Sequence, residues 1–428
     1  MAILSLTSTH PKFSFIIGKN PASGMMIKSI RQGLAYGWFT DDKTFNIYFK
    51  DADNEVSYTK EKEEKFEYLN VSRYNAPIFN LNALSEFYAT ALKGEHLEDV
   101  SGYHHQVFIN MMHIERARFL TIFTKHFPEC DFDFKEVAHK NYQITISTKE
   151  KLSYLLQMLH VFSVFMSLFA PTYLDLSASS IEKALRAIHA VDAPFYIRNL
   201  FAVNVLKKRK EFNAYKKQLE TTNRYDIQLV YGATSTQRRE FITDLLTFER
   251  SILDIGCGEG AYAIPLSQKI EAHPYYAIDI DEEVLASAKK RAVRKEITNI
   301  QFFSDCGAFK KGYDERKIDI ICTEVIEHMP QKAAESLIKD LLTHCNFENL
   351  IITTPNKDFN QFYELTDEFR HPDHHWEMGE DAFKGWLEPL LTQKDVTVKW
   401  LKIGDTVNGI STTQGVHVKK KGGMKHDD

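Results

Sequence analysis

The stretch Asp254-Ile-Gly-Cys-Gly-Glu-Gly260 decides the fold of this chain of 428 residues. It follows the short apolar run 251–253 and leads into a second apolar segment, which predicts a strand, a glycine turn and a helix. A further apolar run, 275–278, ends at Asp279, about twenty residues beyond the turn. A strand, a glycine turn, a helix and a strand that ends in an acid form the nucleotide-binding half of a doubly wound α/β sheet.

The residues of this turn predict a cofactor site. Glycines let the backbone approach a ligand closely, and the acid accepts hydrogen bonds from ribose hydroxyls, so we expect Gly256, Gly258 and Asp279 to contact a nucleotide cofactor. The motif resembles that of class I S-adenosylmethionine-dependent methyltransferases, which implies S-adenosylmethionine as the cofactor. The resemblance also implies that Asp254 meets the methionine ammonium, and this disfavours a dinucleotide oxidoreductase. A tight turn that binds nothing is the third interpretation.

Length and composition set outer limits on the class of protein. A chain of 428 residues is too long for one ordinary core, so two or three domains are expected. The net charge of −5 argues against nucleic-acid binding driven by overall charge, but it allows a local basic groove. The five cysteines show no CxxC spacing, and we interpret them as reduced thiols of a cytoplasmic protein.

Neither the N-terminus nor the most apolar segment of the chain predicts a membrane protein. The N-terminus lacks a basic flank and a long apolar region, so no signal peptide is expected. The most apolar stretch, 154–170, contains Gln157, His160, Ser163 and Ser167. A buried helix is therefore a better interpretation than a membrane span.

The first half predicts an α+β domain over residues 1–200. Alternating apolar residues predict a strand over 44–50, with 33–40 as its hairpin partner. Residues 80–94 predict a helix with an asparagine cap and a glycine stop, and 179–182 has the spacing of a capping box before another helix.

The second half predicts a Rossmann-like domain over residues 225–418, because strands and helices alternate there. Residues 201–224, which include Lys207-Lys-Arg-Lys210, predict a basic helical linker between the two domains. This basic cluster could contact RNA phosphates, but a solvated linker helix is the preferred interpretation. Residues 419–428 predict a polar tail.

A second set of polar residues follows the apolar strand 317–323. If a helix begins there, Glu324, Glu327 and His328 share one helical face and form a three-ligand metal site. Oxygen and imidazole ligands suit Mg²⁺, Mn²⁺, Fe²⁺ or Zn²⁺. The alternative is a solvated helix start whose acids favour the positive end of the helix dipole. Further along, Phe369-Arg-His-Pro-Asp-His-His-Trp-Glu377 contains three histidines, one of which could be a fourth ligand.

Together these segments resemble one family. Glu324-Val-Ile-Glu-His-Met329, Thr354-Pro-Asn-Lys-Asp-Phe-Asn360 and Phe369-Arg-His-Pro-Asp-His374 resemble motifs of the Hen-type small-RNA 3′-terminal ribose 2′-O-methyltransferases, in order and in spacing. The resemblance of residues 1–200 is weaker, and it is to the N-terminal domain of the bacterial members. The chain is therefore similar to a bacterial Hen-type protein.

The resemblance implies roles for particular residues. Glu324, Glu327, His328 and His374 match the ligands of one divalent cation, Mg²⁺ or Mn²⁺, and they match the catalytic set of the family. Arg370 matches an arginine that contacts the RNA end. Arg238 is similar to a family arginine that precedes the cofactor domain, and it is the second expected RNA contact.

The chain departs from the family pattern at two places. Trp376-Glu-Met378 stands where the family usually has an aromatic residue, glutamate and tryptophan. Asp305-Cys306 stands where it usually has glycine and serine. Asp305 still occupies the position at which most class I methyltransferases contact adenine, so it is a further expected cofactor contact.

The chemistry is consistent with this resemblance. A ribose hydroxyl is a poor nucleophile at neutral pH, and a divalent cation lowers the pKa of an oxygen that it binds. Only a 3′-terminal ribose offers free 2′ and 3′ hydroxyls side by side, so a cation that chelates both selects the RNA end. His328 or His374 could accept the proton if it is not bound to the cation.

The expected function is therefore metal-dependent methylation of the 3′ end of RNA, in RNA repair. The resemblance implies that residues 1–200 activate the ligase of a polynucleotide kinase-phosphatase-ligase repair protein. Two alternatives remain: a non-enzymatic scaffold whose N-terminal domain activates the ligase, and a methyltransferase that acts on a protein or a small molecule.

Overall fold

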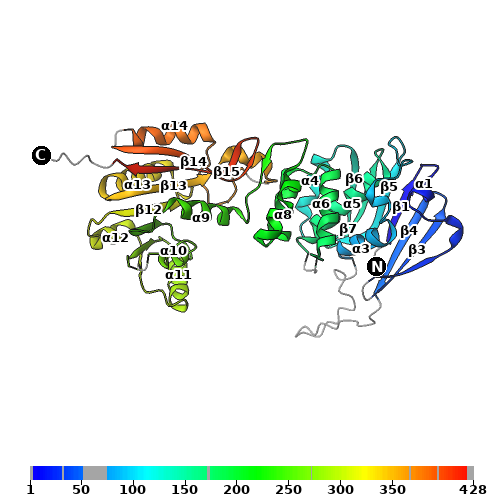
Figure 1. Cartoon of the computed structure of the whole chain (residues 1–428), viewed down its shortest axis with the longest axis horizontal. Coiled ribbons are helices and arrows are strands. Elements are labelled where there is room, and N and C mark those ends of the chain that lie inside the picture. The colour runs from blue at the N-terminus through cyan, green and yellow to red at the C-terminus, as the bar shows by residue number, and fades with distance from the viewer. Residues whose placement is uncertain are drawn as a thin grey trace. The chain divides into compact units, whose positions relative to one another are not determined.

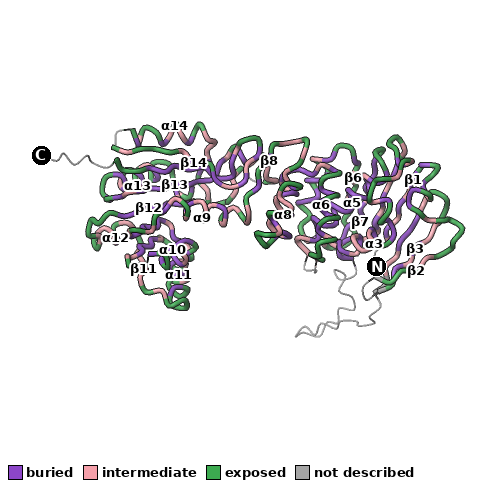
Figure 2. Tube along the Cα trace, viewed as in Figure 1, coloured by how far each residue is buried: buried purple, intermediate pink, exposed green. Residues whose placement is uncertain are grey.

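The computed structural model of the chain describes residues 3–30, 33–51, 75–170, 174–270, 272–365, 368–392 and 395–421. The chain divides into two compact units, Met1–Arg224 and Tyr225–Asp428 (Figure 1). Buried residues lie along the central strands of each unit and, in the first unit, also along the helix Leu152–Ser167 (Figure 2).

The first unit contains a seven-stranded antiparallel sheet in the order β2-β3-β4-β1-β5-β7-β6. The strands are β1 (Ile3–Ser8), β2 (Met26–Ile30), β3 (Gly33–Asp41), β4 (Thr44–Asp51), β5 (His105–His113), β6 (Cys130–Ala138) and β7 (Asn141–Thr148). The expected hairpin is confirmed as β3 and β4, and its side chains Phe45 and Ile47 are buried.

The described helices of the first unit include one that is buried along almost its whole length. They are α1 (Phe13–Ile16), α3 (Ile78–Phe87), α4 (Leu120–His126), α5 (Leu152–Ser167), α6 (Ala178–Ala190), α7 (Phe195–Val205) and α8 (Arg209–Glu220). The prediction of a buried helix is confirmed by α5, which begins where Asp99 accepts hydrogen bonds from the backbone N–H groups of Leu152 (2.7 Å) and Ser153 (3.0 Å). None of the helices described in the structure has the length and apolar character needed to cross a membrane.

Two predicted helix boundaries in the first unit are wrong. The helix expected over 80–94 begins earlier, at Ile78, because Pro77 pre-sets the helical backbone angle just ahead of its first turn. The helix ends at Phe87. Gly94 adopts the left-handed conformation after the short 3₁₀ helix Ala91–Lys93. The cap of α6 is Ser177 rather than Ser179, since the Ser177 hydroxyl accepts the Ser180 N–H.

The segment expected to be a separate linker belongs to the first unit. Helix α8 buries Phe212 and Leu219. The fully buried Arg198 of α7 donates to the backbone carbonyls of Leu219 and Thr221, both at 3.0 Å. Residues 201–224 are therefore an integral part of this helical layer.

The second unit is a doubly wound sheet, as predicted. Its order is β11-β10-β9-β12-β13-β15-β14-β8, with five parallel strands from β11 to β13 followed by antiparallel ones. The strands are β8 (Ile227–Gln228), β9 (Ser251–Ile255), β10 (Tyr275–Ile278), β11 (Ile300–Phe303), β12 (Ile318–Thr323), β13 (Phe347–Pro355), β14 (Val396–Val407) and β15 (Ile410–Lys420). Strand β15 includes the first residues of the expected polar tail, and residues 422–428 lie outside the described residues.

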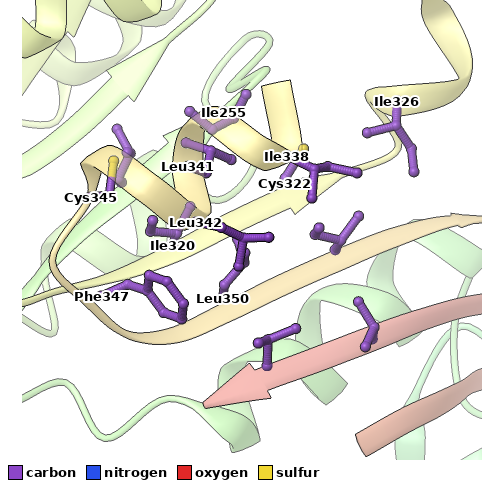
Figure 3. Close-up of a cluster of buried hydrophobic side chains, with 14 of the residues drawn as sticks. Ile255, Ile320, Cys322, Ile326, Ile338, Leu341, Leu342, Cys345, Phe347 and Leu350 are labelled. Atoms are coloured by element: carbon purple, nitrogen blue, oxygen red, sulfur yellow. The ribbon is translucent and has the colours of Figure 1, made fainter. Parts of the chain in front are cut away.

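Helices cover both faces of this sheet. They are α9 (Thr234–Leu245), α10 (Ala263–Ser267), α11 (Glu282–Arg294), α12 (Cys306–Gly312), α13 (Gln331–His344) and α14 (Glu380–Leu391). Figure 3 shows Ile338, Leu341 and Leu342 of α13 against Ile320 and Leu350 of strands β12 and β13. Because both faces are covered, every residue of β9, β10 and β12 is buried.

Candidate active site

Most of the predicted site residues lie at the carboxyl ends of adjacent parallel strands, whereas Arg238 lies in α9, and Arg370 and His374 lie in the segment before α14. The order of the strands reverses at β9, which pairs with β10 on one side and with β12 on the other. Ligands of doubly wound sheets bind outside the carboxyl ends of strands at such a switch point. Asp254 lies in β9, Asp279 follows β10, Glu324 follows β12, and Thr354 lies near the end of β13.

The glycine turn and the acid after β10 are in direct contact. The backbone N–H of Gly258 donates to Asp279 Oδ2 at 2.7 Å, and the N–H of Asp281 donates to Asp279 Oδ1 at 3.0 Å. Gly258 has a φ of +53°, and no atom lies within 4 Å of the position that a Cβ would take. The turn is therefore open beside Gly258, as a close ligand contact requires.

Gly256 has a packing role that sequence reasoning missed. Its φ is +71°, and a Cβ at this residue would lie 2.3 Å from Cγ2 of Val325. Val325 follows Glu324, so this glycine allows the turn to lie directly against the acidic segment after β12. The predicted cofactor contact of Gly256 stays a prediction.

Asp254 is buried beneath the turn. Its Oδ2 accepts a hydrogen bond from the Tyr275 hydroxyl at 3.0 Å, while Oδ1 is buried with no partner among the described residues. Burial raises the pKa of Asp254 to about 7. A nearby cationic group would favour the ionised form, so an unpartnered oxygen at this position fits the ammonium of S-adenosylmethionine. That contact remains a prediction.

Asp305 has a structural role in this unit. It is exposed, and its side chain caps α12 by accepting the Ala308 N–H at 2.8 Å. This hydrogen bond lowers the pKa of Asp305. The expected adenine contact stays untested.

The prediction that Glu324, Glu327 and His328 share one face of an α-helix is wrong. Glu324 has a φ of +55°, residues Ile326–His328 form a short 3₁₀ helix, and α13 begins only at Gln331. Proline disfavours helical angles in the residue before it, and Met329, which precedes Pro330, is extended. A continuous helix from Glu324 is therefore excluded.

Strand β13 and helix α9 hold the two carboxylates. Glu324 Oε1 accepts from the Thr353 hydroxyl at 3.2 Å, and its Oε2 lies 3.1 Å from Nη1 of Arg238. Glu327 is fully buried, and its Oε2 accepts from the Thr354 hydroxyl at 3.1 Å. Its Oε1 has no partner among the described residues. Burial, and then the Glu324 carboxylate, raise the pKa of Glu327 well above its ordinary value.

The histidine segment docks onto the acidic segment. The backbone N–H of His375 donates to the Glu327 carbonyl at 2.8 Å, and the Trp376 indole donates to the Met329 carbonyl at 2.9 Å. The rings of His328 and His374 are 4.7 Å apart between centroids. Burial, followed by the neighbouring His374, lowers the pKa of His328.

The side chains fit a divalent cation, but the grouping differs from the expected one. Within the described residues, His328, His371 and His374 offer ligand atoms that all lie within 4.8 Å of one another. Glu324 and Glu327 are not members of that group. Oε1 of buried Glu327 has no hydrogen-bond partner among the described residues, so this oxygen could bind a cation. Carboxylate and imidazole groups commonly bind one metal ion together. His371 is thus a further candidate ligand.

Arg370 is anchored inside the unit. Its guanidinium donates to the backbone carbonyls of Thr412 (2.7 Å) and Asn356 (2.5 Å) and to Oδ1 of Asn360 (2.6 Å). Burial lowers the pKa of Arg370. Its predicted contact with the RNA end, like that of Arg238, stays a prediction.

Sequence reasoning missed the residues that support the site. Thr353 and Thr354 bind the carboxylates, and Glu377 accepts hydrogen bonds from His374 and Asn360. The one available signal for Glu377 was its position three residues after His374 in a segment rich in ligand-type side chains.

Comparison with known proteins agrees with this architecture. Residues 3–224 match the family described as Hen1 N-terminal domain, and residues 252–346 match the family described as Methyltransferase domain. The chain is 25% identical over 200 residues to a small RNA 2′-O-methyltransferase of Gallus gallus and 28% identical over 179 residues to one of Caenorhabditis elegans. These matches cover 43% and 36% of this chain and 53% and 40% of the relatives, so the chain spans about half of their length or less.

Similarity to solved structures extends over both units. The chain is similar to a chain in a structure of a Pnkp1/Rnl/Hen1 complex, with 26% identity and a TM-score of 0.80. The match covers 98% of this chain and 100% of that chain. Since the Hen1 N-terminal domain match alone spans more than half of the sequence, the chain belongs to that family, and it continues into a methyltransferase domain.

Proposed function

We propose that the second unit transfers a methyl group from S-adenosylmethionine to the 2′-hydroxyl of the 3′-terminal nucleotide of RNA, with one divalent cation, Mg²⁺ or Mn²⁺. The observation that carries this proposal is the pair of neighbouring rings of His328 and His374 close to the glycine turn at the switch point of the sheet. The histidine segment is hydrogen-bonded to the backbone of Glu327, and Val325 of the same acidic segment lies against Gly256 of the turn. The family and the names of the relatives support RNA as the substrate class.

The proposed reaction is a single displacement. The ribose O2′ forms a bond to the methyl carbon, and the carbon–sulfur bond breaks with its electron pair left on sulfur. The hydroxyl proton passes to a base, and S-adenosylhomocysteine is the second product. Such a transfer needs in-line placement of donor and acceptor, so positioning by the protein supplies much of the rate.

The residues of the site divide between donor and acceptor. Asp254, Gly256, Gly258 and Asp279 hold the methyl donor, with Asp305 near its adenine. Arg238 and Arg370 contact the RNA end. Glu324, Glu327, His328 and His374 hold the cation, which would lower the pKa of the hydroxyl groups that it binds.

We expect this activity to require the complete terminal diol. RNA with free 2′ and 3′ hydroxyls should accept a tritiated methyl group in the presence of Mn²⁺, and the product should resist periodate, which cleaves only a free diol. RNA that ends in a 3′-phosphate or a 2′-deoxynucleotide should not react, and excess chelator should abolish transfer. Full activity in chelator would show that methyl transfer needs no divalent cation. Equal methylation of internal riboses would show that the enzyme does not select the 3′-terminal nucleotide.

We further propose that the first unit binds a polynucleotide kinase-phosphatase-ligase and stimulates end sealing, so that methylation accompanies repair. The support is the likeness of the whole chain to a chain in a Pnkp1/Rnl/Hen1 complex. The first unit also has its own sheet and helical layer, as an independent interaction domain requires.

Separation of the chain after Arg224 tests this second proposal. Residues 1–224 alone should stimulate sealing of broken RNA by the ligase, and residues 225–428 alone should still methylate. The opposite result would be no effect of residues 1–224 on sealing, together with loss of methylation when they are removed. That result would show that the first unit only helps RNA to dock on the methyltransferase domain.

A further inference from the structure

Glu377 is a buried carboxylate on which three hydrogen-bond donors converge. Its side chain is 0% exposed. Oε1 accepts from His374 Nδ1 at 2.6 Å and from the backbone N–H of Arg370 at 2.7 Å. Oε2 accepts from Nδ2 of Asn360 at 2.7 Å. A buried carboxylate is stable only when its oxygens are satisfied in this way.

The direction of each hydrogen bond follows from one group that can only donate. Nε of Arg370 donates to Oδ1 of Asn360 at 2.6 Å, and a guanidinium has no acceptor. Asn360 must therefore turn its NH₂ group towards Glu377. The Arg370 backbone N–H also only donates, so each oxygen of Glu377 accepts at least one hydrogen bond. An ionised carboxylate has no proton to donate, so Nδ1 of His374 then supplies the proton of their shared hydrogen bond.

This arrangement fixes the tautomer of His374. A neutral imidazole with its proton on Nδ1 keeps the free lone pair on Nε2. The His374 ring lies beside the His328 ring, so Nε2 is the nitrogen left for a cation shared with His328. Side chains that orient a ligating histidine in this way commonly change metal affinity by about 10–100-fold when they are replaced.

We infer that Glu377 is a positioning residue that holds His374 in the Nδ1–H tautomer and in one ring orientation for cation binding. The identity of the ligand rests on the proposed function, whereas the effect of Glu377 on the His374 ring does not. The same carboxylate ties His374 to Arg370 through Asn360, so the cation site and the anchored arginine share one hydrogen-bonded network.

A swap of donor and acceptor tests the network. In Glu377→Gln, an amide NH₂ group replaces one carboxylate oxygen. In one orientation this NH₂ group faces the Arg370 N–H, and in the other it faces the NH₂ group of Asn360, so two hydrogen-bond donors always meet. The second change Asn360→Asp restores a donor–acceptor pair and returns the negative charge to the cluster. Glu377→Ala removes the acceptor entirely. Glu388→Gln, at an exposed position of α14, is the matched control.

Two readouts on purified full-length protein decide the matter. In the metal-free protein, long-range ¹H–¹⁵N correlation spectra report the His374 tautomer, and calorimetry with Mn²⁺ alone reports affinity. Glu377→Ala should populate the Nε2–H tautomer and raise the Mn²⁺ dissociation constant about 10–100-fold. Glu377→Gln should shift in the same direction, the double variant should recover most of the affinity, and Glu388→Gln should match the parent chain.

The inference is overturned if His374 keeps the Nδ1–H tautomer in both single variants and Mn²⁺ binds with unchanged affinity. A merely structural role would lower the melting temperature of Glu377→Ala but leave the tautomer and the Mn²⁺ affinity of Glu377→Gln unchanged. If the parent chain binds no Mn²⁺, the proposed cation site fails, while the tautomer in the two single variants still decides whether Glu377 positions His374.

Discussion

Glu327→Gln is expected to reduce methyl transfer at least about 100-fold, which corresponds to about 2.7 kcal/mol of transition-state stabilisation. The amide has nearly the same shape as the carboxylate and can still accept the hydrogen bond from Thr354. It has no negative charge, so it is a much poorer ligand for a divalent cation. Filter-bound tritium from a 3′-terminal diol RNA measures the loss.

The same substitution is not expected to destabilise the metal-free protein. Burial and the Glu324 carboxylate raise the pKa of Glu327 well above its ordinary value, so the folded protein holds this proton more tightly than the unfolded chain does. Stability from this group is complete below the unfolded pKa of about 4.3, and it is lost as the pH rises through the folded pKa. Glutamine does not titrate, so the variant should avoid that loss.

Thermal melting at pH 5 and pH 8 without divalent ions checks this sign. The parent chain should lose more stability between the two pH values than Glu327→Gln does. Mn²⁺ should raise the melting temperature of the parent chain and not that of the variant, because only ligand binding to the native state stabilises it. Glu388→Gln should resemble the parent chain in both assays. Unchanged methyl transfer in Glu327→Gln would remove this residue from the site.

The strands and the glycine turn around Asp254 and Asp279 were predictable because their signals are local. The apolar runs before Asp254 and Asp279 are short and continuous, as strands buried on both faces are. The turn between β9 and α10 needs positive φ angles, which glycine adopts without strain. The glycines in the sequence therefore predict the conformation of this turn. Even so, the packing of Gly256 on Val325 joins two segments far apart in the sequence, and no local pattern reveals it.

The ligand geometry after β12 was only partly predictable. The residue types predict a candidate site, which stays a prediction, but the helical face expected for them is the wrong geometry. Pro330 argued against a continuous helix, because a proline disfavours helical backbone angles in the preceding residue, here Met329. The left-handed conformation of Glu324 had no such signal, because a non-glycine residue enters that region only when its surroundings compensate for the strain. Here the Glu324 backbone N–H is bound by the Thr353 carbonyl.

The supporting contacts could not be predicted, because they depend on tertiary structure. Glu377 and Thr354 acquire their roles from segments that meet only in the folded unit. Helix α8 shows the same limit in another form. Its buried Phe212 and Leu219 are seven residues apart, which is an amphipathic spacing, but the basic residues around them favoured a solvated linker.

Arg198 accounts for the packing of α8, and Arg198→Met is expected to destabilise the first unit by about 3–5 kcal/mol. Its guanidinium is fully buried and donates to the carbonyls of Leu219 and Thr221 and to the Asp192 carboxylate. Methionine fills a similar volume but donates no hydrogen bond. The two carbonyls and the carboxylate would then lose the hydrogen bonds that Arg198 donates to them. Removing one partner of a buried pair is costly for this reason.

Denaturant unfolding of residues 1–224 measures the effect. Arg186→Met changes an exposed arginine of α6 and should cost less than about 0.5 kcal/mol, as surface substitutions usually do. Arg198→Lys should fall between the two, because an ammonium keeps the charge but cannot reach several carbonyls with a planar fork. Since the carbonyls of Leu219 and Thr221 lie at the end of α8, the loss should appear first as exposure of this helix to amide hydrogen exchange. A loss below about 1 kcal/mol for Arg198→Met, with α8 still protected, would show that Phe212 and Leu219 hold this helix without the arginine.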